Sequence, residues 1–292
     1  MIPLLSIIIP CYGGFDQRLV ERCSDSVKQQ GLAPGQYEIV LVENDGGGGL
    51  GGARNRGMDA AAGTYLLFLD ADDYLFPQSL VRLAELLTTY SPDVLSYGME
   101  RVKAGSRPPR FRGRLHYRKY PTGAAYMLQH NFTGSACRHL FRRSFVCRSR
   151  LRFSEGCFHE DELFVAEAYA LAGTTVVTAY PAYAYTRSEA SITTSQTQMM
   201  RRRRSTDFRQ VLTGMRQLTA QISDGNYPLR ASALRRRTSM LTIDYLRQLI
   251  RNRSPRIRQE LRTLRSEGFL PLPAARYGWK YTVVRGLLNL LG

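Results

Sequence analysis

The pattern of apolar and polar positions predicts two kinds of structure along the chain. Up to about residue 185, short apolar runs alternate with stretches whose apolar residues recur at helical spacing. The apolar runs at 5–10, 37–42, 64–73 and 92–100 predict strands, and residues 16–30, 53–63 and 77–90 predict the helices between them. Strands and helices in alternation are typical of an α/β fold with a mostly parallel central sheet flanked by helices.

After residue 193 the chain changes to longer amphipathic segments with arginines between the apolar positions. Residues 201–218, 229–253 and 277–291 share this pattern, which predicts helices. We therefore assign residues 1–195 to an α/β domain and residues 196–292 to a basic α-helical region. Within the first of these, "GSRPPRFRGR" (105–114) predicts a mobile loop.

Composition places the chain among ordinary globular proteins, with 43% hydrophobic and 22% charged residues over a length of 292. The five cysteines are odd in number and form no CxxC pair, so free thiols in a reducing compartment are expected. The apolar start lacks the basic residues and cleavage site of a secretory signal. No apolar run approaches the ~20 residues of a membrane-spanning helix. These features predict a cytoplasmic protein.

The net charge of +17 is concentrated in the helical region. Residues 201–292 contain 20 Arg and Lys against 5 Asp and Glu, a net charge of +15. Such a region suits an anionic membrane surface or a nucleic acid, and it can equally be a solubilising surface on packed helices.

The stretch "VENDGGGGLGGARNRG" (42–57) raises the question of whether it binds a phosphate. A P-loop is excluded because no Lys-Ser or Lys-Thr pair follows the glycines. The dinucleotide pattern GxGxxG is matched twice, from Gly46 and from Gly47, which leaves an NAD-dependent oxidoreductase as an alternative. A flexible surface loop explains the same glycines, since so dense a run matches almost any spaced-glycine pattern.

The third predicted strand ends in three carboxylates, in "FLDADD" (68–73). Open α/β sheets bind ligands at the carboxyl ends of their strands, and Asp70, Asp72 and Asp73 repel one another unless they share a cation. Oxygen ligands at such a place fit Mg²⁺ or Mn²⁺ bridging the phosphates of a nucleotide. A helix-capping turn explains one of the aspartates but hardly all three. The segment therefore predicts a metal site.

Five motifs occur in order over roughly the first 190 residues. They are "SIIIPCYG" (6–13), the acidic residue Glu43, "GGARNRG" (51–57), "FLDADDYLFP" (68–77) and "HEDELF" (159–164). Together they resemble the family 2 glycosyltransferases of the GT-A fold, the bacterial enzymes that build cell-surface polysaccharides. The resemblance implies a Rossmann-like GT-A domain with a helical appendage. It also implies an inverting, metal-dependent, hexosyltransferase-type enzyme that takes a sugar from a nucleotide sugar, most often a UDP-sugar.

The resemblance assigns roles to single positions around the donor. The nucleotide-binding residues that it implies are Pro10, Cys11, Tyr12, Glu43, Arg54, Asp70 and Ala71. Glu43 stands where the family usually has an aspartate that accepts a hydrogen bond from the base, and Arg54 is expected to face the diphosphate. Asp72 is the implied ligand of Mn²⁺ or Mg²⁺, which would offset charge on the departing nucleoside diphosphate. Asp73 is expected to be structural.

The remaining assignments concern the reaction and the acceptor. Inversion by direct displacement needs a carboxylate that takes the proton of the acceptor hydroxyl, and Asp161 matches that position, with Glu160 as its competitor. Acidic residues also favour the first turn of any helix, which is the structural alternative for both. Arg138 and His139 are candidate acceptor contacts, and Arg187 is a candidate contact to the diphosphate.

The partners implied are a nucleotide-sugar donor and a glycan or lipid-linked saccharide acceptor in envelope polysaccharide synthesis. Because such acceptors are commonly lipid-linked in the family, the basic helices are expected to bind the inner face of the cell membrane peripherally rather than a nucleic acid. An NAD-dependent oxidoreductase and a nucleic-acid-binding protein are the alternatives. Neither explains Asp70, Asp72 and Asp161 together.

Overall fold

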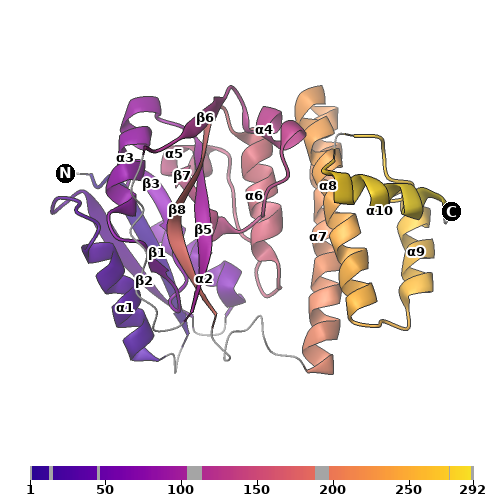
Figure 1. The fold of residues 1–292 in the computed structure, drawn as a ribbon, viewed down its shortest axis with the longest axis horizontal. Coiled ribbons are helices and arrows are strands. Elements are labelled where there is room, and N and C mark those ends of the chain that lie inside the picture. The colour runs from indigo at the N-terminus through magenta and orange to yellow at the C-terminus, as the bar shows by residue number, and fades with distance from the viewer. Residues whose placement is uncertain are drawn as a thin grey trace. The chain divides into compact units, whose positions relative to one another are not determined.

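The computed structural model describes residues 2–12, 16–44, 47–103, 114–187, 197–275 and 277–290 (Figure 1). The chain forms two compact units, Met1–Gly123 with Gly134–Ser195 and Ala124–Thr133 with Gln196–Gly292. Residues 124–133, from the middle of the chain, thus belong with the later helices. The roles of the two units as catalytic domain and appendage stay a prediction. The loop predicted at 105–114 lies outside the described residues except for Arg114.

The first unit alternates strands and helices. Its strands are β1 (Leu5–Tyr12), β2 (Tyr37–Asn44), β3 (Tyr65–Phe68), β4 (Tyr74–Leu75), β5 (Val94–Lys103), β6 (Tyr117–Tyr120), β7 (His139–Arg142) and β8 (Thr175–Arg187). Its helices are α1 (Gln17–Lys28), α2 (Gly49–Ala60), α3 (Ser79–Tyr90), α5 (Arg143–Arg148) and α6 (Glu160–Leu171), with a 3₁₀ turn at Ala136–Arg138. Helix α4 (Gly123–Gln129) begins at the boundary between the units.

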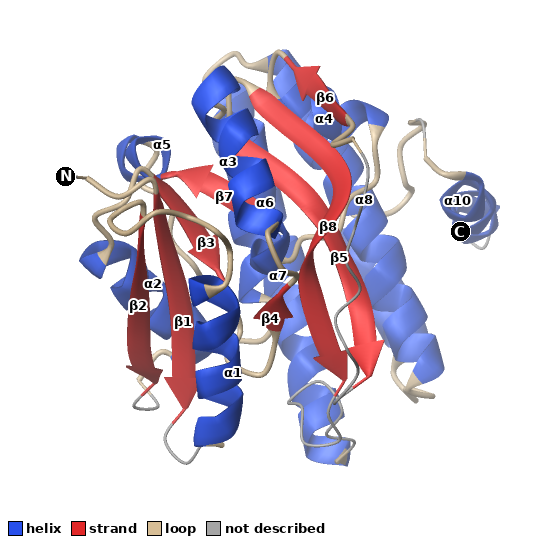
Figure 2. Cartoon of the chain, turned by 60° about the vertical axis from the view of Figure 1, so that its left-hand side comes forward, coloured by secondary structure: helices blue, strands red, loops and turns tan. Residues whose placement is uncertain are grey.

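The described strands form one sheet in the order β2-β1-β3-β7-β5-β8-β4, with β6 pairing with β8. β1 runs parallel to β2 and β3, and β5 runs parallel to β8. β7 lies antiparallel between β3 and β5, and β4 and β6 are antiparallel to β8 (Figure 2). The sheet is therefore mixed where the sequence predicted a mostly parallel one. Antiparallel neighbours need no crossover helix, and β4, β6 and β7 are short strands of this kind.

Helices cover both faces of the sheet, with α1 and α3 on one face and α2 and α6 on the other (Figure 1). An aromatic cluster fills the space under α6. Phe153 and Phe164 stack with their ring centres 3.9 Å apart, and Phe68 of β3 meets their rings edge-on at 5.1 and 6.2 Å. Such arrangements add to the stabilisation from apolar burial. The cluster gives the ends of β3 and α6 a common support.

Helix α2 begins within the glycine run and depends on it for close packing. Gly48 stands before its first turn with φ of 75°, in the left-handed region that favours glycine. A Cβ at Gly51 would overlap the carbonyl oxygen of Ser154. One turn later, Asn55 donates to the carbonyl of Phe153 (3.0 Å) and accepts from its amide (2.9 Å). The absence of a side chain at Gly51 thus lets the backbone of Ser154 pack directly against helix α2.

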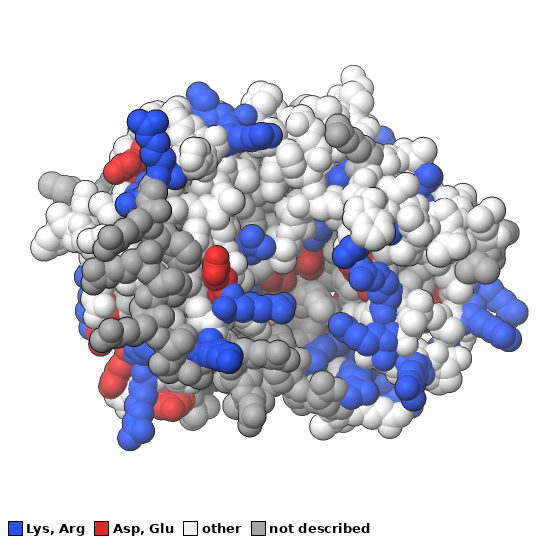
Figure 3. Space-filling model, viewed as in Figure 1, with Lys and Arg blue, Asp and Glu red and all other residues white. Residues whose placement is uncertain are grey.

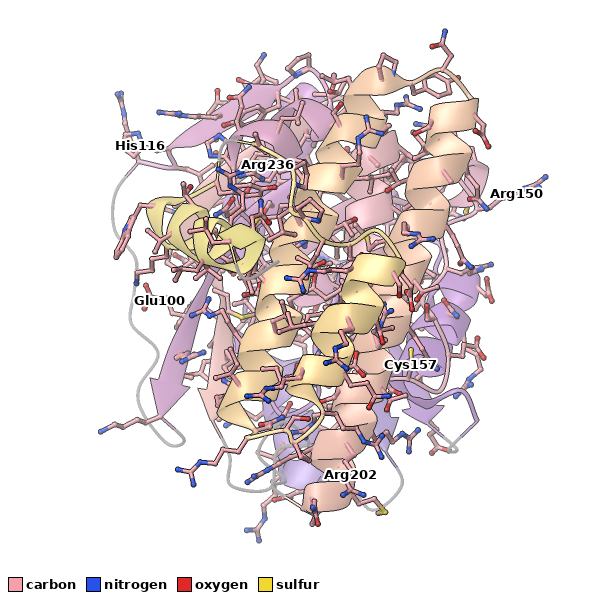
Figure 4. All side chains as sticks on the ribbon, turned by 90° about the vertical axis from the view of Figure 1, so that its right-hand side faces the viewer. Glu100, His116, Arg150, Cys157, Arg202 and Arg236 are labelled. Carbon is pink, nitrogen blue, oxygen red and sulfur yellow. The ribbon has the colours of Figure 1, made fainter. Side chains whose placement is uncertain are left out.

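The second unit consists of α7 (Gln198–Asp224), α8 (Pro228–Arg251), α9 (Ile257–Ser266) and α10 (Trp279–Leu290), together with residues 124–133. Two buried arginines of α8 hold that middle segment. Arg236 donates to the carbonyls of Met127 (2.7 Å) and His130 (2.9 Å), and Arg237 donates to the carbonyl of Phe132 (2.7 Å). Arg236 lies among the side chains of its unit (Figure 4). Over the described part of the chain, no helix combines the length and apolarity needed to cross a membrane.

We expect Gly51→Ala to lower the free energy of unfolding by about 1–3 kcal/mol, because its methyl group must displace the backbone of Ser154. Gly286→Ala is the matched control. Gly286 lies inside α10 with no atom within 4 Å of an added Cβ, so alanine is expected to stabilise the helix by up to about 1 kcal/mol. Urea denaturation followed by circular dichroism measures both. A Gly51→Ala protein as stable as the wild type would contradict the close approach.

Candidate functional site

The carboxyl ends of β1 and β2 bring together the residues predicted to bind the base. Pro10 and Cys11 lie near the end of β1 beside β2, where Cys11 is in register with Glu43. Burial, and then the charge of Glu43, raises the pKa of the Cys11 thiol, which agrees with their proximity. The side chain of Glu43 is exposed. Tyr12 is the last residue of β1, and its side chain lies outside the described residues.

Arg54, on α2, is buried in a cluster of carboxylates. Its Nη1 lies 2.7 Å from Oε1 of Glu160, and its Nη2 lies 3.0 Å from Oδ1 of Asp70. The guanidinium carbon is 5.4 Å from the centre of the Phe153 ring, and the residue is 2% exposed. Both outer nitrogens bind carboxylates and the side chain is enclosed, and the contact of Arg54 with a diphosphate stays a prediction. Arg54 joins the end of β3 to the start of α6.

The aspartates of "DADD" have different environments. The Asp70 side chain is 33% exposed and pairs with Arg54. Asp73 is buried and accepts hydrogen bonds from the Tyr183 hydroxyl (2.7 Å) and the Thr186 amide (2.6 Å). Burial, and then the charge of Asp70, raises the pKa of Asp73 to about 8, and both of its carboxyl oxygens are already used as hydrogen-bond acceptors within the protein. These contacts agree with the structural role predicted for Asp73.

Asp72 is the aspartate of this turn best suited to hold a cation. It is partly exposed, and its backbone is fixed because Arg22 donates to its carbonyl oxygen and to the Thr186 hydroxyl (3.4 Å). No group of three His, Cys, Asp or Glu side chains within the described ranges could hold a metal ion by itself. Proteins commonly hold Mg²⁺ with one or two carboxylates while substrate phosphates supply further oxygens. Asp72 fits that arrangement.

Sequence reasoning missed two residues that shape the turn. The Tyr183 hydroxyl accepts from the amide of Asp70 (3.2 Å) while it donates to Asp73, so one phenol fixes both ends of "DADD". Arg22 acts from α1, 50 residues before its partner Asp72. No local pattern marks a tyrosine in a strand or an arginine on a helix as a partner of a distant turn.

The first turn of α6 carries the acidic residues Glu160, Asp161 and Glu162. Glu160 is buried and paired with Arg54, whereas Asp161 is partly exposed. Burial, followed by the charges of Glu160 and Glu162, raises the pKa of Asp161 well above the usual aspartate range. A carboxylate with a raised pKa takes up a proton more readily, which is the property of a general base. Asp161 is the more accessible of the two carboxylates, and its role as the base stays a prediction.

His139 is a structural residue, which corrects its prediction as an acceptor contact. It is 1% exposed on the interior strand β7, and its Nδ1 donates to the carbonyl of Ser135 (2.8 Å). Its Nε2 therefore accepts from the Tyr169 hydroxyl (3.0 Å). Burial lowers the pKa of His139 to about 3, so the ring is neutral. An acceptor cannot reach it without opening the core.

The other predicted contacts lie at more accessible places. Arg138 is partly exposed at the end of the 3₁₀ turn. Arg187 is the last residue of β8, and its side chain lies outside the described residues. Ala71 is buried.

Residues 41–148 match the sequence model of the family described as Glycosyl transferase family 2. An uncharacterized glycosyltransferase, EpsJ of Bacillus subtilis, is 32% identical over 200 residues, which cover 58% of this chain and 57% of EpsJ. The succinoglycan biosynthesis protein ExoO of Rhizobium meliloti is 28% identical over 185 residues, which cover 60% of this chain and 53% of ExoO. The chain thus spans little more than half the length of these relatives.

Among solved structures, the chain is similar to S. aureus TarS. The crystal structure of TarS 1–349 in complex with UDP-GlcNAc has a TM-score of 0.59 at 18% identity and covers 84% of this chain and 81% of that one. A structure of TarS 1–349 in complex with UDP has a TM-score of 0.55 at 21% identity, with 72% and 65% covered. The likeness confirms the predicted α/β GT-A fold with helices in its C-terminal region. The matched segment identifies residues 41–148 as a glycosyl transferase family 2 segment, and the relatives EpsJ and ExoO agree with that family.

Proposed function

We propose that the protein is an inverting glycosyltransferase that moves a sugar from a UDP-sugar to a hydroxyl of a glycan or lipid-linked saccharide in envelope polysaccharide synthesis. The observation that carries the proposal is the cluster in which Arg54 joins Asp70 to Glu160, beside Asp161 and Asp72. These carboxylates lie at the strand ends where α/β sheets bind nucleotides, which supports the roles proposed for Asp161 as the base and Asp72 as the metal ligand. The TarS complexes with UDP and UDP-GlcNAc and the functions named for EpsJ and ExoO support the donor and the pathway.

In this proposal the donor lies across the ends of β1, β2 and β3. Pro10, Cys11 and Tyr12 flank the base, and Glu43 accepts a hydrogen bond from it. Asp70 contacts the ribose while Arg54 fixes its orientation from behind. Bound Mn²⁺ or Mg²⁺ at Asp72 would offset the charge of the diphosphate leaving group. Arg187 and the backbone of Ala71 are further proposed contacts.

The acceptor side of the reaction is assigned to the start of α6. The oxygen of the acceptor hydroxyl attacks the anomeric carbon of the donor sugar while Asp161 takes the hydroxyl proton, and the bond from that carbon to the nucleoside diphosphate breaks. A single displacement of this kind inverts the configuration at the anomeric carbon. Arg138 is the proposed contact to the acceptor, since His139 is enclosed.

The packing of α2 argues against an NAD-dependent oxidoreductase. In that alternative the glycines would let a pyrophosphate approach the backbone. Gly51 instead packs against the carbonyl of Ser154, and the doubled pattern begins at Gly46, outside the described residues. The family match and the relatives' names favour neither an oxidoreductase nor a nucleic-acid-binding protein.

We expect UDP to raise the melting temperature in the presence of Mn²⁺ and to do so weakly in its absence. A ligand at a hundred times its Kd adds about 2.7 kcal/mol of stability, which a thermal melt resolves. Asp72→Ala is expected to abolish the part of this rise in melting temperature that depends on Mn²⁺. Asp25→Ala, which removes an exposed carboxylate of α1, is the matched control and should leave the shift intact. Stabilisation by NAD without metal, or an undiminished UDP shift in Asp72→Ala, would overturn the donor site.

A further inference from the structure

Helix α10 presents a row of large apolar side chains to solvent. Trp279, Val283, Leu287 and Leu290 are 74%, 56%, 57% and 83% exposed. At about 100° per residue these positions fall within roughly 80° of one another around the helix axis. They form one continuous strip, which we call the α10 stripe. Scattered apolar residues are normal on a surface, but an aligned row on one helix marks an interaction surface.

The opposite side of α10 is fastened to its own unit. The Tyr281 hydroxyl donates to the carboxylate of Asp244 on α8 at 2.9 Å. Asn289 accepts from the amide of Leu272 (2.8 Å) and donates to its carbonyl (2.9 Å). These bonds lie near both ends of the helix and fix its rotation. The side chains of the stripe are therefore kept facing the solvent.

The surroundings of the stripe are basic. No Asp or Glu occurs from residue 268 to residue 292, and α10 itself carries Lys280 and Arg285. Exposed arginines continue along the same unit, among them Arg247, Arg251 and Arg258. Lys and Arg gather over α7 and α8 (Figure 3), and Arg202 projects from the start of α7 (Figure 4). On α10 itself Lys280 borders the stripe, whereas Arg285 falls on the packed side of the helix. A partner that covers the stripe therefore approaches a unit of strongly positive charge.

We propose that the α10 stripe docks on an anionic lipid surface. Tryptophan and leucine on one side of a helix, with a lysine beside them and a basic unit around them, is the composition of helices that lie in a membrane interface. A second copy of the chain is disfavoured as the occupant, because two regions of net charge +15 would be brought together. The inference rests on α10 and its unit and is independent of the reaction proposed for the first unit.

The chain contains one tryptophan, so its fluorescence reports directly on the stripe. Trp279 is exposed, and its emission is expected to shift to shorter wavelength when the full chain meets vesicles containing phosphatidylglycerol. Vesicles of phosphatidylcholine alone should produce little shift, and added salt should reduce the response to the anionic vesicles. No shift with phosphatidylglycerol at low salt would overturn the proposal, as would equal shifts with both lipids.

Vesicle flotation with matched variants tests the surface itself. Leu287→Ser with Leu290→Ser keeps the reporter and should weaken partition onto the anionic vesicles by about tenfold or more. Ile250→Ser is the control, because Ile250 is an exposed apolar residue of α8 (61%) outside the stripe, and it should float like the wild type. Circular dichroism confirms that each variant is folded. An equal loss of vesicle binding in the double variant and in Ile250→Ser would overturn lipid as the occupant of the stripe. So would a blue shift of Trp279 emission that grows with protein concentration and accompanies dimer formation in the absence of lipid.

Discussion

Replacing Asp161 with asparagine is expected to lower kcat by on the order of 10²–10⁴ while nucleotide binding is retained. Asparagine keeps the size of the side chain but cannot take the proton of the attacking hydroxyl. Turnover is measured as release of UDP from UDP-sugar donors, and binding as the melting shift produced by UDP with Mn²⁺. A kcat within about tenfold of the wild type would show that a group other than Asp161 takes the proton of the acceptor hydroxyl.

The stability of the same variant separates a base from a structural carboxylate. Because burial and the neighbouring carboxylates raise the pKa of Asp161, its ionised form is disfavoured in the folded state. The asparagine side chain carries no charge, so Asp161→Asn is expected to be at least as stable as the wild type at neutral pH. Glu160→Gln breaks the 2.7 Å pair with Arg54 and is expected to lower the free energy of unfolding.

The raised pKa of Asp161 also sets the expected pH dependence. Only the ionised carboxylate accepts a proton, so kcat/KM should fall as the pH is lowered through that pKa. The fall should begin closer to neutral pH than it would for an ordinary aspartate, whose pKa is about 3.9. A kcat/KM that falls only at the pH expected of an ordinary aspartate would contradict the assignment of Asp161 as the base.

Arg54→Met is expected to lower the free energy of unfolding by about 3–5 kcal/mol, the range for removing one partner of a buried ion pair. The substitution keeps much of the apolar stem against Phe153 but leaves Glu160 buried and Asp70 without its cation. We expect the lower end of the range, since Asp70 retains some contact with water. Urea denaturation followed by circular dichroism is the measurement, because Trp279 fluorescence reports only on the second unit.

Two further variants test whether the loss comes from the ion pairs. Arg56→Met makes the same change two residues along α2, where the side chain is exposed, and should cost less than about 1 kcal/mol. Adding Glu160→Gln to Arg54→Met should recover part of the loss, because the buried charge is removed as well. Strictly additive losses in the double variant would show that Arg54 and Glu160 do not stabilise each other.

The fold was predictable where local pattern and tertiary packing agree. In the first hundred residues the sequence pattern predicted β1, β2, β3 and β5 and the helices between them, but it missed the two-residue strand β4 and extended β3 through "DADD". Helix α2 was expected from residue 53 and begins at Gly49, because glycines disfavour a helix unless close packing requires them. Helix α9 was missed although Ile257, Leu261 and Leu264 recur at helical spacing, a signal outweighed by the arginines between them.

The sequence predicted which residues belong to the candidate site better than it predicted the contacts that those residues make. Motif order pointed to Asp70, Asp72 and Asp161. It did not reveal that Arg54 is enclosed by carboxylates or that His139 is buried, because burial depends on which strand becomes interior. Tyr183 carried no local signal, since its partners lie more than a hundred residues away.

The ion pair between Arg54 and Glu160 joins positions 106 residues apart, and the bonds from Asn55 to Phe153 join positions 98 apart. Closing such long loops costs chain entropy that is offset only when both ends are in place. During synthesis, α2 and β3 leave the ribosome long before α6. The βα units at the start of the chain can therefore form early, but the nascent chain has no assembled site until residue 160 has emerged.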